Sequence, residues 1–346
     1  MPIENGVTLF TSDSRPRYAV DLLNVLALPL GTEYHFRYST SYVPSQIRHE
    51  FENCNAPGTV ALIAFRDESQ QAEAPFMVPV RWATITSVQL VADFYVVGFE
   101  LGNYPILSDH YNGNRAEIEE KSSAQREEFV AATRDLPVQA GLTSLVEPTT
   151  NFDRNTWIQI AKTLALHERF SSTHFLRVRG VTDRMGRDAW HSSERAYVLS
   201  ERQYGRIRLD YFAEEYEEDD AVLCFTGDES LIRIASRANI PLDSRYDSRQ
   251  VLIQAGSVPG HTSTEVEISV CATHENPYQT TLRLPFQVSR SKGVIIARIA
   301  TSAAGAGMVA APGILGDTLQ PVSAVLVVCV GALVLAIGTN LVGSSR

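Results

Sequence analysis

The residues best suited to binding a ligand are aromatic and cationic side chains within the first 100 positions. Aromatic walls with a few directional polar groups are what a cleft for a planar or anionic ligand needs. Alternation along a strand would place Arg37 on the face opposite Phe36. Tyrosine and tryptophan in strands also pack in cores and across strands, which is the alternative interpretation. The candidate ligand-binding residues are His35, Arg37, Tyr38, Tyr42, Arg81, Trp82 and Tyr95.

A run of carboxylates, EEYEEDD, occupies positions 214–220. Calcium prefers dense oxygen ligands, so a cation site is one interpretation of this run. The run lacks the alternating acidic residues and the glycine of a calcium-binding loop, and a charge run is more often a solvated turn. We therefore assign no metal-binding residue.

A second polar segment, DRMGRDAWHSSE, spans positions 183–194 and groups Asp183, Asp188, His191 and Glu194 around Gly186. Such a group suits a hydrolytic or metal-binding loop, and it equally suits a turn between two strands. The sequence contains no GxSxG, GxxxxGK[ST] or HExxH motif. We predict no catalytic residue and no cofactor, and an enzyme that uses this loop stays open as a hypothesis.

The elements that position the first set of residues lie in positions 1–112. Pro16 opens a helical pattern, YAVDLLNVLALPL, that ends near Pro29. Four strand-like runs follow it, and in the third, residues 76–90, apolar and aromatic side chains recur at every second position. These patterns predict a small curled β-sheet or barrel with one helix. The four runs are EYHFRY, TVALIAFR, FMVPVRWATITSVQL and DFYVVGFEL.

Residues 113–152 are charged and nearly free of β-branched side chains in their first half, which predicts an exposed connecting helix and linker. A second helix follows, WIQIAKTLALHERF, with Asp153 or Asn155 as its N-cap. Its apolar residues form one stripe that should pack on a sheet. The stripe consists of Trp157, Ile160, Ala161, Leu164 and Ala165.

Residues 153–289 combine this helix with eight short strand-like runs separated by turn residues. Strands at this spacing predict an antiparallel β-sandwich, and an immunoglobulin-like one is possible although the Cys and Trp spacing of antibody domains is absent. The runs are HFLRVRGVT, RAYVLS, GRIRLDYF, AVLCF, SLIRIAS, RQVLIQA, TEVEISVCA and TTLRLPFQV.

Residues 293–342 have the composition of a two-helix membrane hairpin. Positions 322–342 are long and apolar enough to cross a bilayer, and positions 293–315 form a weaker span that contains Arg298. GDTLQP between them supplies turn residues. Arg298 would either extend to the headgroups or line a pore. Small residues four apart would allow close packing within one hairpin or between subunits. They are Ala303, Gly307, Ala332 and Ala336.

The distribution of charge predicts which side of the membrane the chain occupies. Arg290, Lys292 and Arg346 flank the two spans, while the turn carries only Asp317, so both hairpin ends should be cytoplasmic. The first residues lack the pattern of a secretory signal. Four cysteines far apart, without CxxC spacing, are typical of a reducing compartment and not of a disulfide framework. We therefore expect the two units to face the cytoplasm.

The whole pattern predicts a mainly β protein with a few helices and a C-terminal transmembrane α-helical hairpin. A net charge of −10 argues against general nucleic-acid binding. The leading hypothesis is a membrane-anchored binding or sensor protein whose partners are the lipid bilayer and an unknown small molecule or protein. The alternative is a membrane-perturbing effector, for example in bacterial defence, whose hairpins assemble into a homo-oligomer.

Overall fold

The structure is a computed structural model with three β-sheets and few helices, which confirms the mainly β prediction. It describes residues 8–12, 15–67, 76–107, 129–131, 153–214, 221–236, 239–242, 244–258, 260–272 and 279–290. Within these ranges no helix is both long and apolar enough to cross a membrane. The predicted hairpin, with Arg298, Ala303, Gly307, Ala332 and Ala336, lies outside the described residues, as do positions 215–220 of the acidic run.

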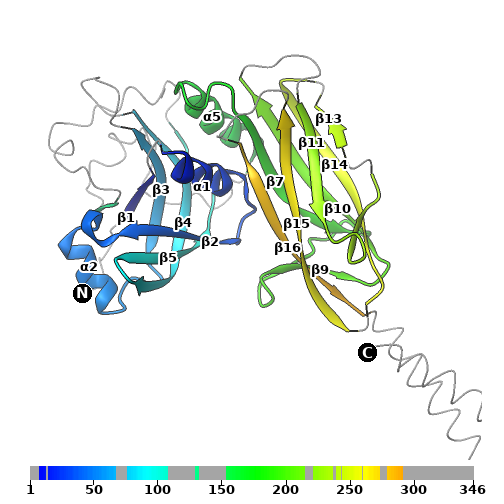
Figure 1. Ribbon diagram of the computed structural model, residues 1–346, viewed down its shortest axis with the longest axis horizontal. Coiled ribbons are helices and arrows are strands. Elements are labelled where there is room, and N and C mark those ends of the chain that lie inside the picture. The colour runs from blue at the N-terminus through cyan, green and yellow to red at the C-terminus, as the bar shows by residue number, and fades with distance from the viewer. Residues whose placement is uncertain are drawn as a thin grey trace, which may run out of the picture.

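The N-terminal unit is one bent, six-stranded sheet in the order β2-β5-β4-β3-β1-β6 (Figure 1). β1 and β3 are parallel, and the other pairs are antiparallel. Register shifts after Ile63 and Ile85 mark bulges, which bend β4 so that β2 and β5 cross the direction of β3 (Figure 1). The strands are β1 (Thr8–Ser12), β2 (Glu33–Ser39), β3 (Val60–Asp67), β4 (Phe76–Val91), β5 (Phe94–Leu101) and β6 (Phe129–Ala131).

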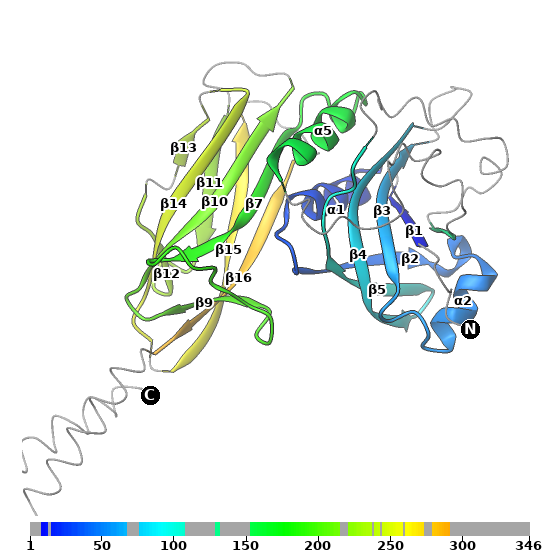
Figure 2. The same cartoon turned by 180° about the vertical axis from the view of Figure 1, so that it is seen from behind.

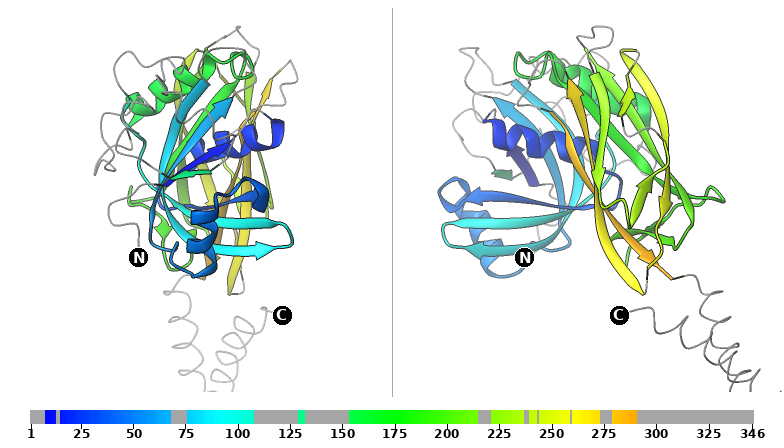
Figure 3. Two further views of the ribbon diagram at one scale, coloured as in Figure 1. Left: turned by 90° about the vertical axis from the view of Figure 1, so that its left-hand side faces the viewer. Right: turned by 45° about the vertical axis from the view of Figure 1, so that its right-hand side comes forward.

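Two α-helices and a short 3₁₀ helix complete this unit: α1 (Pro16–Ala27), η1 (Thr40–Tyr42) and α2 (Ser45–Glu52). Pro16 begins α1 as predicted, where its missing N–H leaves no hydrogen bond unmade. Ala19, Leu22, Leu23 and Leu26 form its buried stripe. α1 contacts β3 and β4 on one side and strands of the second unit on the other, so it lies between the two units (Figure 3).

Strand β6 corrects the prediction for residues 113–152. Phe129–Ala131 pairs antiparallel with β1, from Thr8 opposite Ala131 to Phe10 opposite Phe129. The predicted connecting helix is therefore wrong at these three residues, and the rest of that segment lies outside the described residues. The edge of β1 that does not pair with β3 carries free backbone N–H and C=O groups, and pairing with β6 satisfies them. Phe and Val at positions 129 and 130 are residues that favour a strand.

The second unit consists of two sheets that face each other (Figures 1 and 2). One has the order β12-β14-β10-β7 and the other β13-β11-β15-β16-β9-β8. All pairs are antiparallel except β9 with β16, which are parallel. All eight predicted strands are present. The strands are β7 (His174–Asp183), β8 (Trp190–His191), β9 (Ala196–Ser200), β10 (Tyr204–Ala213), β11 (Ala221–Gly227), β12 (Ile232–Ile234), β13 (Asn239–Pro241), β14 (Tyr246–Ala255), β15 (His261–Ala272) and β16 (Thr281–Ser289).

Helix α5 (Arg154–Ala165) begins where the sequence predicts. The Asp153 carboxylate accepts a hydrogen bond of 2.7 Å from the Thr156 N–H and so caps the helix. The predicted apolar stripe is buried, and the helix packs on β4 of the first unit and β10 of the second. One continuous hydrophobic core therefore runs through both units.

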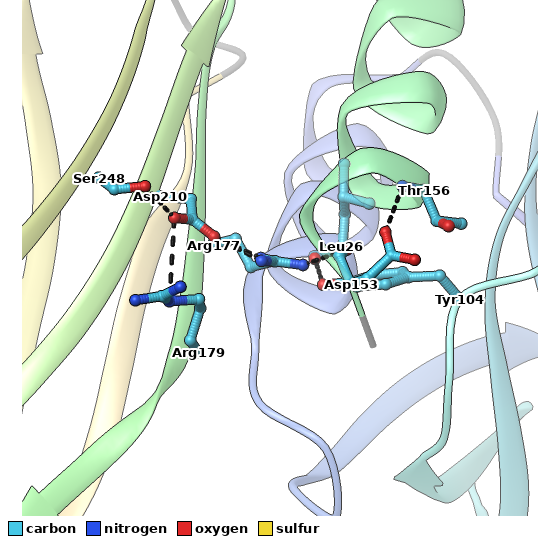
Figure 4. A network of polar contacts seen from close by, with 8 residues as sticks. All are labelled: Leu26, Tyr104, Asp153, Thr156, Arg177, Arg179, Asp210 and Ser248. Atoms are coloured by element: carbon cyan, nitrogen blue, oxygen red, sulfur yellow. Dashed lines mark hydrogen bonds and ion pairs between the residues drawn. The ribbon is translucent and has the colours of Figure 1, made fainter. Parts of the chain in front are cut away.

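A buried ion pair stands at the junction of the units (Figure 4). Arg177 of β7 donates to Asp210 Oδ2 of β10 through Nε at 3.0 Å and Nη2 at 2.5 Å, and both side chains are at most 1% exposed. Ser248 donates to Asp210 Oδ1 at 2.6 Å, and Arg177 Nη1 also donates to the Asp153 carbonyl. These bonds join α5 to the second unit.

Tyr104 extends this network to the N-terminal unit. Its hydroxyl donates to the Leu26 carbonyl of α1 at 2.8 Å, and its ring lies 5.9 Å from the Arg177 guanidinium (Figure 4). Arg81 of β4 lies over the same ring at 4.4 Å. Hydrogen bonds and cation–π contacts therefore hold the two units in a fixed arrangement.

A disulfide corrects the prediction that the cysteines are unpaired. Cys224 of β11 and Cys271 of β15 are bonded, with Cα atoms 6.3 Å apart, while Cys54 is free. The two are 47 positions apart in sequence. Because the register sets Cys224 opposite Ser269, Cys271 is its diagonal neighbour on the next strand.

Reduction of this disulfide is expected to lower the free energy of unfolding by about 2–4 kcal/mol, because the cross-link restricts the unfolded chain. Urea unfolding of the full chain with and without dithiothreitol measures the difference. Cys54→Ser keeps the disulfide and should show the same loss, whereas Cys271→Ser should show none. Equal stability of the oxidised and reduced wild-type protein would contradict the expectation.

Candidate functional site

The seven predicted binding residues divide between the core and the surface. Tyr38, Arg81, Trp82 and Tyr95 are buried, and Arg81 Nε donates to the Gly102 carbonyl at 2.5 Å. His35, Arg37 and Tyr42 are exposed, and Arg37 does lie on the face opposite Phe36. Of the set, His35 alone lines the cleft described next.

A cleft of about 550 Å³ lies at the junction of the two units. Helix α1 and the start of β2 form one wall, and β8, β15 and β16 with the loops beside them form the other. Its volume falls in the range of about 300–1,000 Å³ that small-molecule sites occupy, and junctions between domains are a preferred place for such sites. Its apolar lining consists of Val20, Leu28, Trp190, Leu282 and Pro285.

Tyr34 of β2 is the centre of a hydrogen-bond network in the first wall. Its hydroxyl donates to Asp21 Oδ1 at 2.8 Å and accepts from Asn24 Nδ2 at 3.5 Å. Burial and the Asp21 charge raise the pKa of Tyr34 far above its usual value. Burial also raises the pKa of Asp21, although Tyr34 and Arg17 oppose the shift. Tyr34 is therefore neutral at physiological pH, and its proton is directed at Asp21.

Two buried polar atoms of the cleft lining have no hydrogen-bond partner. They are Asn24 Oδ1, an acceptor, and Thr32 Oγ1, a hydroxyl that donates and accepts. Thr32 is 7% exposed. A buried polar atom without a partner costs about 1–3 kcal/mol, so folded proteins seldom leave one unless something else binds it. Both atoms are also closed to solvent, so they do not form part of the accessible surface of the cleft.

An ion pair bridges the two walls. Arg195, before β9, forms an ion pair with Glu33 Oε2 of β2. Thr86 donates to the other carboxylate oxygen of Glu33 at 2.9 Å, and His35 Nε2 lies 3.9 Å from it. Both carboxylate oxygens thus have partners within the protein. Across the cleft, Arg283 Nε donates to Glu267 at 3.1 Å, so this guanidinium is paired too.

Gly31 lets the chain turn from α1 into β2 and bring Thr32 into the cleft. Its φ of +77° is one that residues with a Cβ rarely adopt. Its N–H donates to the Leu101 carbonyl at 2.8 Å, which fixes the turn against β5. A Cβ here would lie 3.5 Å from Trp190 Nε1, so the indole of the second unit approaches this turn closely.

The polar segment 183–194 is a turn, as its alternative interpretation predicted. Asp183 accepts hydrogen bonds from the Met185 and Arg187 backbone and from the Arg187 side chain, at 2.7–2.9 Å. Asp188 accepts from the Trp190 N–H at 3.0 Å. Among the described residues no three His, Cys, Asp or Glu side chains form a metal site. The turn positions Trp190 at the cleft.

Asp183→Asn is expected to reduce the loss of unfolding free energy that the wild type shows as the pH falls. Burial would raise the pKa of Asp183, but hydrogen bonds from Arg187 and Met185 outweigh it and hold that pKa below its usual value. The carboxylate therefore stabilises the fold above about pH 3.9, and this contribution is lost as the pH falls through the lower pKa of the folded state. Urea unfolding between about pH 5 and pH 2.5 tests this; a variant as acid-sensitive as the wild type would contradict it.

Sequence reasoning missed most of the cleft. Asn24 and Thr32 are ordinary neutral residues of a helix and a turn, with no motif around them. Trp190 and Arg195 lie in or beside the segment that the sequence singled out for its carboxylates. The available signal was Gly31 next to Thr32, because a glycine at the start of a strand marks a tight turn.

No protein-family model matches this sequence, and no curated protein matches it. Among solved structures, the chain has a low similarity to a Bacteroides ovatus GH5 xyloglucanase in complex with a XXXG heptasaccharide. The two are 11% identical with a TM-score of 0.19, over 34% of this chain and 19% of the other. The match thus spans about a fifth of that enzyme, and a likeness this weak carries no argument about fold or function.

Proposed function

We propose that this protein is a membrane-anchored binding protein that takes a small molecule into the cleft between its two units. One observation carries the proposal: a cleft of about 550 Å³, lined by apolar side chains and a few polar ones, lies at the junction of the two units. A cleft of this size between two domains is typical of a small-molecule site. The rigid junction around Arg177 keeps the cleft preformed, which lowers the entropic cost of binding.

The second unit would then supply half of the binding site. Its sheet orders support an immunoglobulin-like sandwich. With β7, β10, β12 and β14 as strands A, B, D and E, the first sheet has the order of the ABED sheet, and β11, β15 and β16 correspond to C, F and G. Folds of this class present loops at their ends and edges for binding. Trp190 and Arg195 lie at the edge that faces α1.

Residues 293–342 form the anchor in this proposal, with both ends of the hairpin at the cytoplasmic face. The full chain should stay in the membrane fraction after a wash with alkaline carbonate. Deletion of residues 293–346 should release the protein from that fraction. A truncated chain that still sediments with membranes would contradict the anchor. The thiol state of Cys224 and Cys271, trapped in intact cells by alkylation, tests the placement, because persistent disulfides are typical of oxidising compartments.

Thermal denaturation of the full chain in lipid nanodiscs tests the cleft. The probes are neutral sugars, uronic acids, primary amines and nucleobases. We expect one class to raise the midpoint for the wild type and not for Val20→Trp or Thr281→Trp, which fill the cleft from opposite walls. Leu90→Trp, at an exposed position outside the cleft, is the matched control. The proposed function would be contradicted if no class of probe raised the thermal midpoint of the wild type. It would also be contradicted if Val20→Trp and Thr281→Trp both kept the increase.

A further inference from the structure

We propose that the outer face of the sheet β12-β14-β10-β7 binds the anionic headgroups of the bilayer through a cluster of arginines, called here the arginine face. This inference rests on the membrane anchor of the proposed function and adds a contact between the second unit and the lipid. The arginine face consists of Arg179 of β7, Arg206 and Arg208 of β10, and Arg233 of β12.

The strands place these four arginines on one side of the sheet. Buried residues alternate with the arginines along β10 and β12, so Arg206, Arg208 and Arg233 point away from the opposite sheet. Arg179 lies on the same side, because its Nε is 3.9 Å from Oδ1 of Asp210, two positions after Arg208 (Figure 4). The four side chains therefore belong to one surface.

The arginine face has a positive charge that its own sheet does not balance. Arg206, Arg208 and Arg233 form no ion pair with any residue that the structure describes, and Arg206 and Arg233 are exposed. The register sets neutral residues beside them on the same face: Gly180, Thr182, Tyr204, Gln250, Leu252 and Gln254.

The loops next to these strands contain charges of both signs. Asp183 is paired with Arg187. Arg184 and Arg202 are the other cations of these loops, and no carboxylate there forms an ion pair with the arginine face among the described residues. The carboxylates without an ion pair are Asp188, Glu201, Asp228 and Glu229.

Arg208 and Arg179 bring two like charges to neighbouring positions. Arg208 lies opposite Gly180, and a Cβ at Gly180 would be 3.6 Å from Arg208 Nη2, so this guanidinium lies on the backbone of β7 beside Arg179. The carboxylate nearest to Arg179, that of Asp210, already accepts two hydrogen bonds from Arg177. Like charges at neighbouring positions are destabilising, and a phosphate bound by both guanidinium groups would relieve the repulsion.

The arginine face is at the end of the second unit where β16 ends. The Glu201 N–H, just before β10, donates to the carbonyl of Ser289, the last residue of β16, at 2.7 Å. Arg206 follows in the first half of β10, and β12 brings Arg233 beside the end of β14 at Ala255. Because the proposed anchor begins shortly after Ser289, it would keep these arginines near the headgroups.

The charge of the rest of the chain selects a bilayer over a free polyanion. The net charge is −10, so the chain without these four arginines has −10 − 4 = −14. This charge repels a nucleic acid that approaches from solution. The anchor instead gives the lipid a high effective concentration, and the acidic remainder would turn the arginine face toward an anionic leaflet.

Energy transfer from the arginine face to the bilayer tests the inference on the full chain. Tyr204→Cys together with Cys54→Ser leaves one free thiol for a fluorescent donor, on the face and 42% exposed in the wild type. The acceptor is a headgroup-labelled lipid in nanodiscs of phosphatidylcholine, with or without phosphatidylserine. We expect phosphatidylserine to increase the transfer and high salt to abolish the increase.

Arg206→Gln with Arg233→Gln removes two charges from exposed positions of the face. Each lost arginine should reduce the fraction of molecules in contact with lipid about fivefold. Arg17→Gln with Arg37→Gln is the matched control, because it removes the same charge from exposed positions of the first unit and should keep the increase.

The outcomes separate this contact from the anchor. A chain that stays in both kinds of nanodisc and shows equal transfer in them would overturn this inference and leave the anchor standing. An increase that Arg206→Gln with Arg233→Gln retains would also overturn it. A chain that enters neither nanodisc would overturn the anchor and this inference together. Binding of labelled oligothymidine that this double variant loses, without an effect of phosphatidylserine, would assign the face to nucleic acid instead.

Discussion

Replacement of Asp210 by alanine is expected to lower the free energy of unfolding by about 3–5 kcal/mol, because it leaves the Arg177 charge buried without its partner. The side chains of both residues are at most 1% exposed. Asp210 accepts two hydrogen bonds from Arg177 and one from Ser248, and bulk solvent does not reach a side chain at that depth. Urea unfolding of the full chain, followed by tryptophan fluorescence, measures the loss.

Two further variants separate the buried charge from lost packing. The double variant Arg177→Met with Asp210→Leu removes both charges and keeps apolar volume, so it should regain most of the stability that Asp210→Ala loses. Glu267→Ala breaks the exposed ion pair with Arg283 and should cost less than about 1 kcal/mol. A loss below about 1 kcal/mol for Asp210→Ala would mean that water or another residue solvates Arg177.

The ion pair between Glu33 and Arg195 shows why little of the cleft could be predicted from the sequence. Periodicity predicted eight of the ten described strands of the second unit and the capped helix α5, because those signals are local in the chain. The cleft depends on contacts between distant segments. Glu33 and Arg195 are 162 positions apart, and nothing local to either residue selects the other.

The buried aromatic residues show a second limit of periodicity. Residues 76–83 of β4 are buried on both faces, because this strand lies inside its sheet and helices pack against it. Alternation of apolar and polar residues distinguishes the two faces of a strand only when one face is in solvent, and residues 76–83 have no such face. Arg81 and Trp82 therefore read as available side chains in the sequence although both lie in the core.

The predictions for residues 129–131 and for the cysteines were wrong for a related reason. Phe129–Ala131 is a three-residue strand, and only the open edge of β1 makes it one. Cys224 and Cys271 become neighbours through the register of β11 with β15, which the spacing of cysteines does not reveal. In both places tertiary pairing overrides the local signal.

Trp157→Ala is expected to cost about 3–5 kcal/mol, because it opens a cavity where α5 joins the two units. The Trp157 side chain is fully buried, and the Arg177 guanidinium lies 5.5 Å from its ring. Its Nε1–H has no hydrogen-bond partner. Trp157→Phe removes that unpaired group along with some volume, so we expect it to cost about 1 kcal/mol or less.

The same unfolding measurement, made on both variants, tests this explanation. If Trp157→Phe costs as much as Trp157→Ala, the indole N–H has a partner after all and the cavity is not the main cause. If Trp157→Ala also abolishes ligand-induced stabilisation, α5 holds the walls of the cleft at their distance. That result would connect packing at the junction to binding, because Arg177 contacts both Trp157 and Tyr104, and Tyr104 binds the last turn of α1.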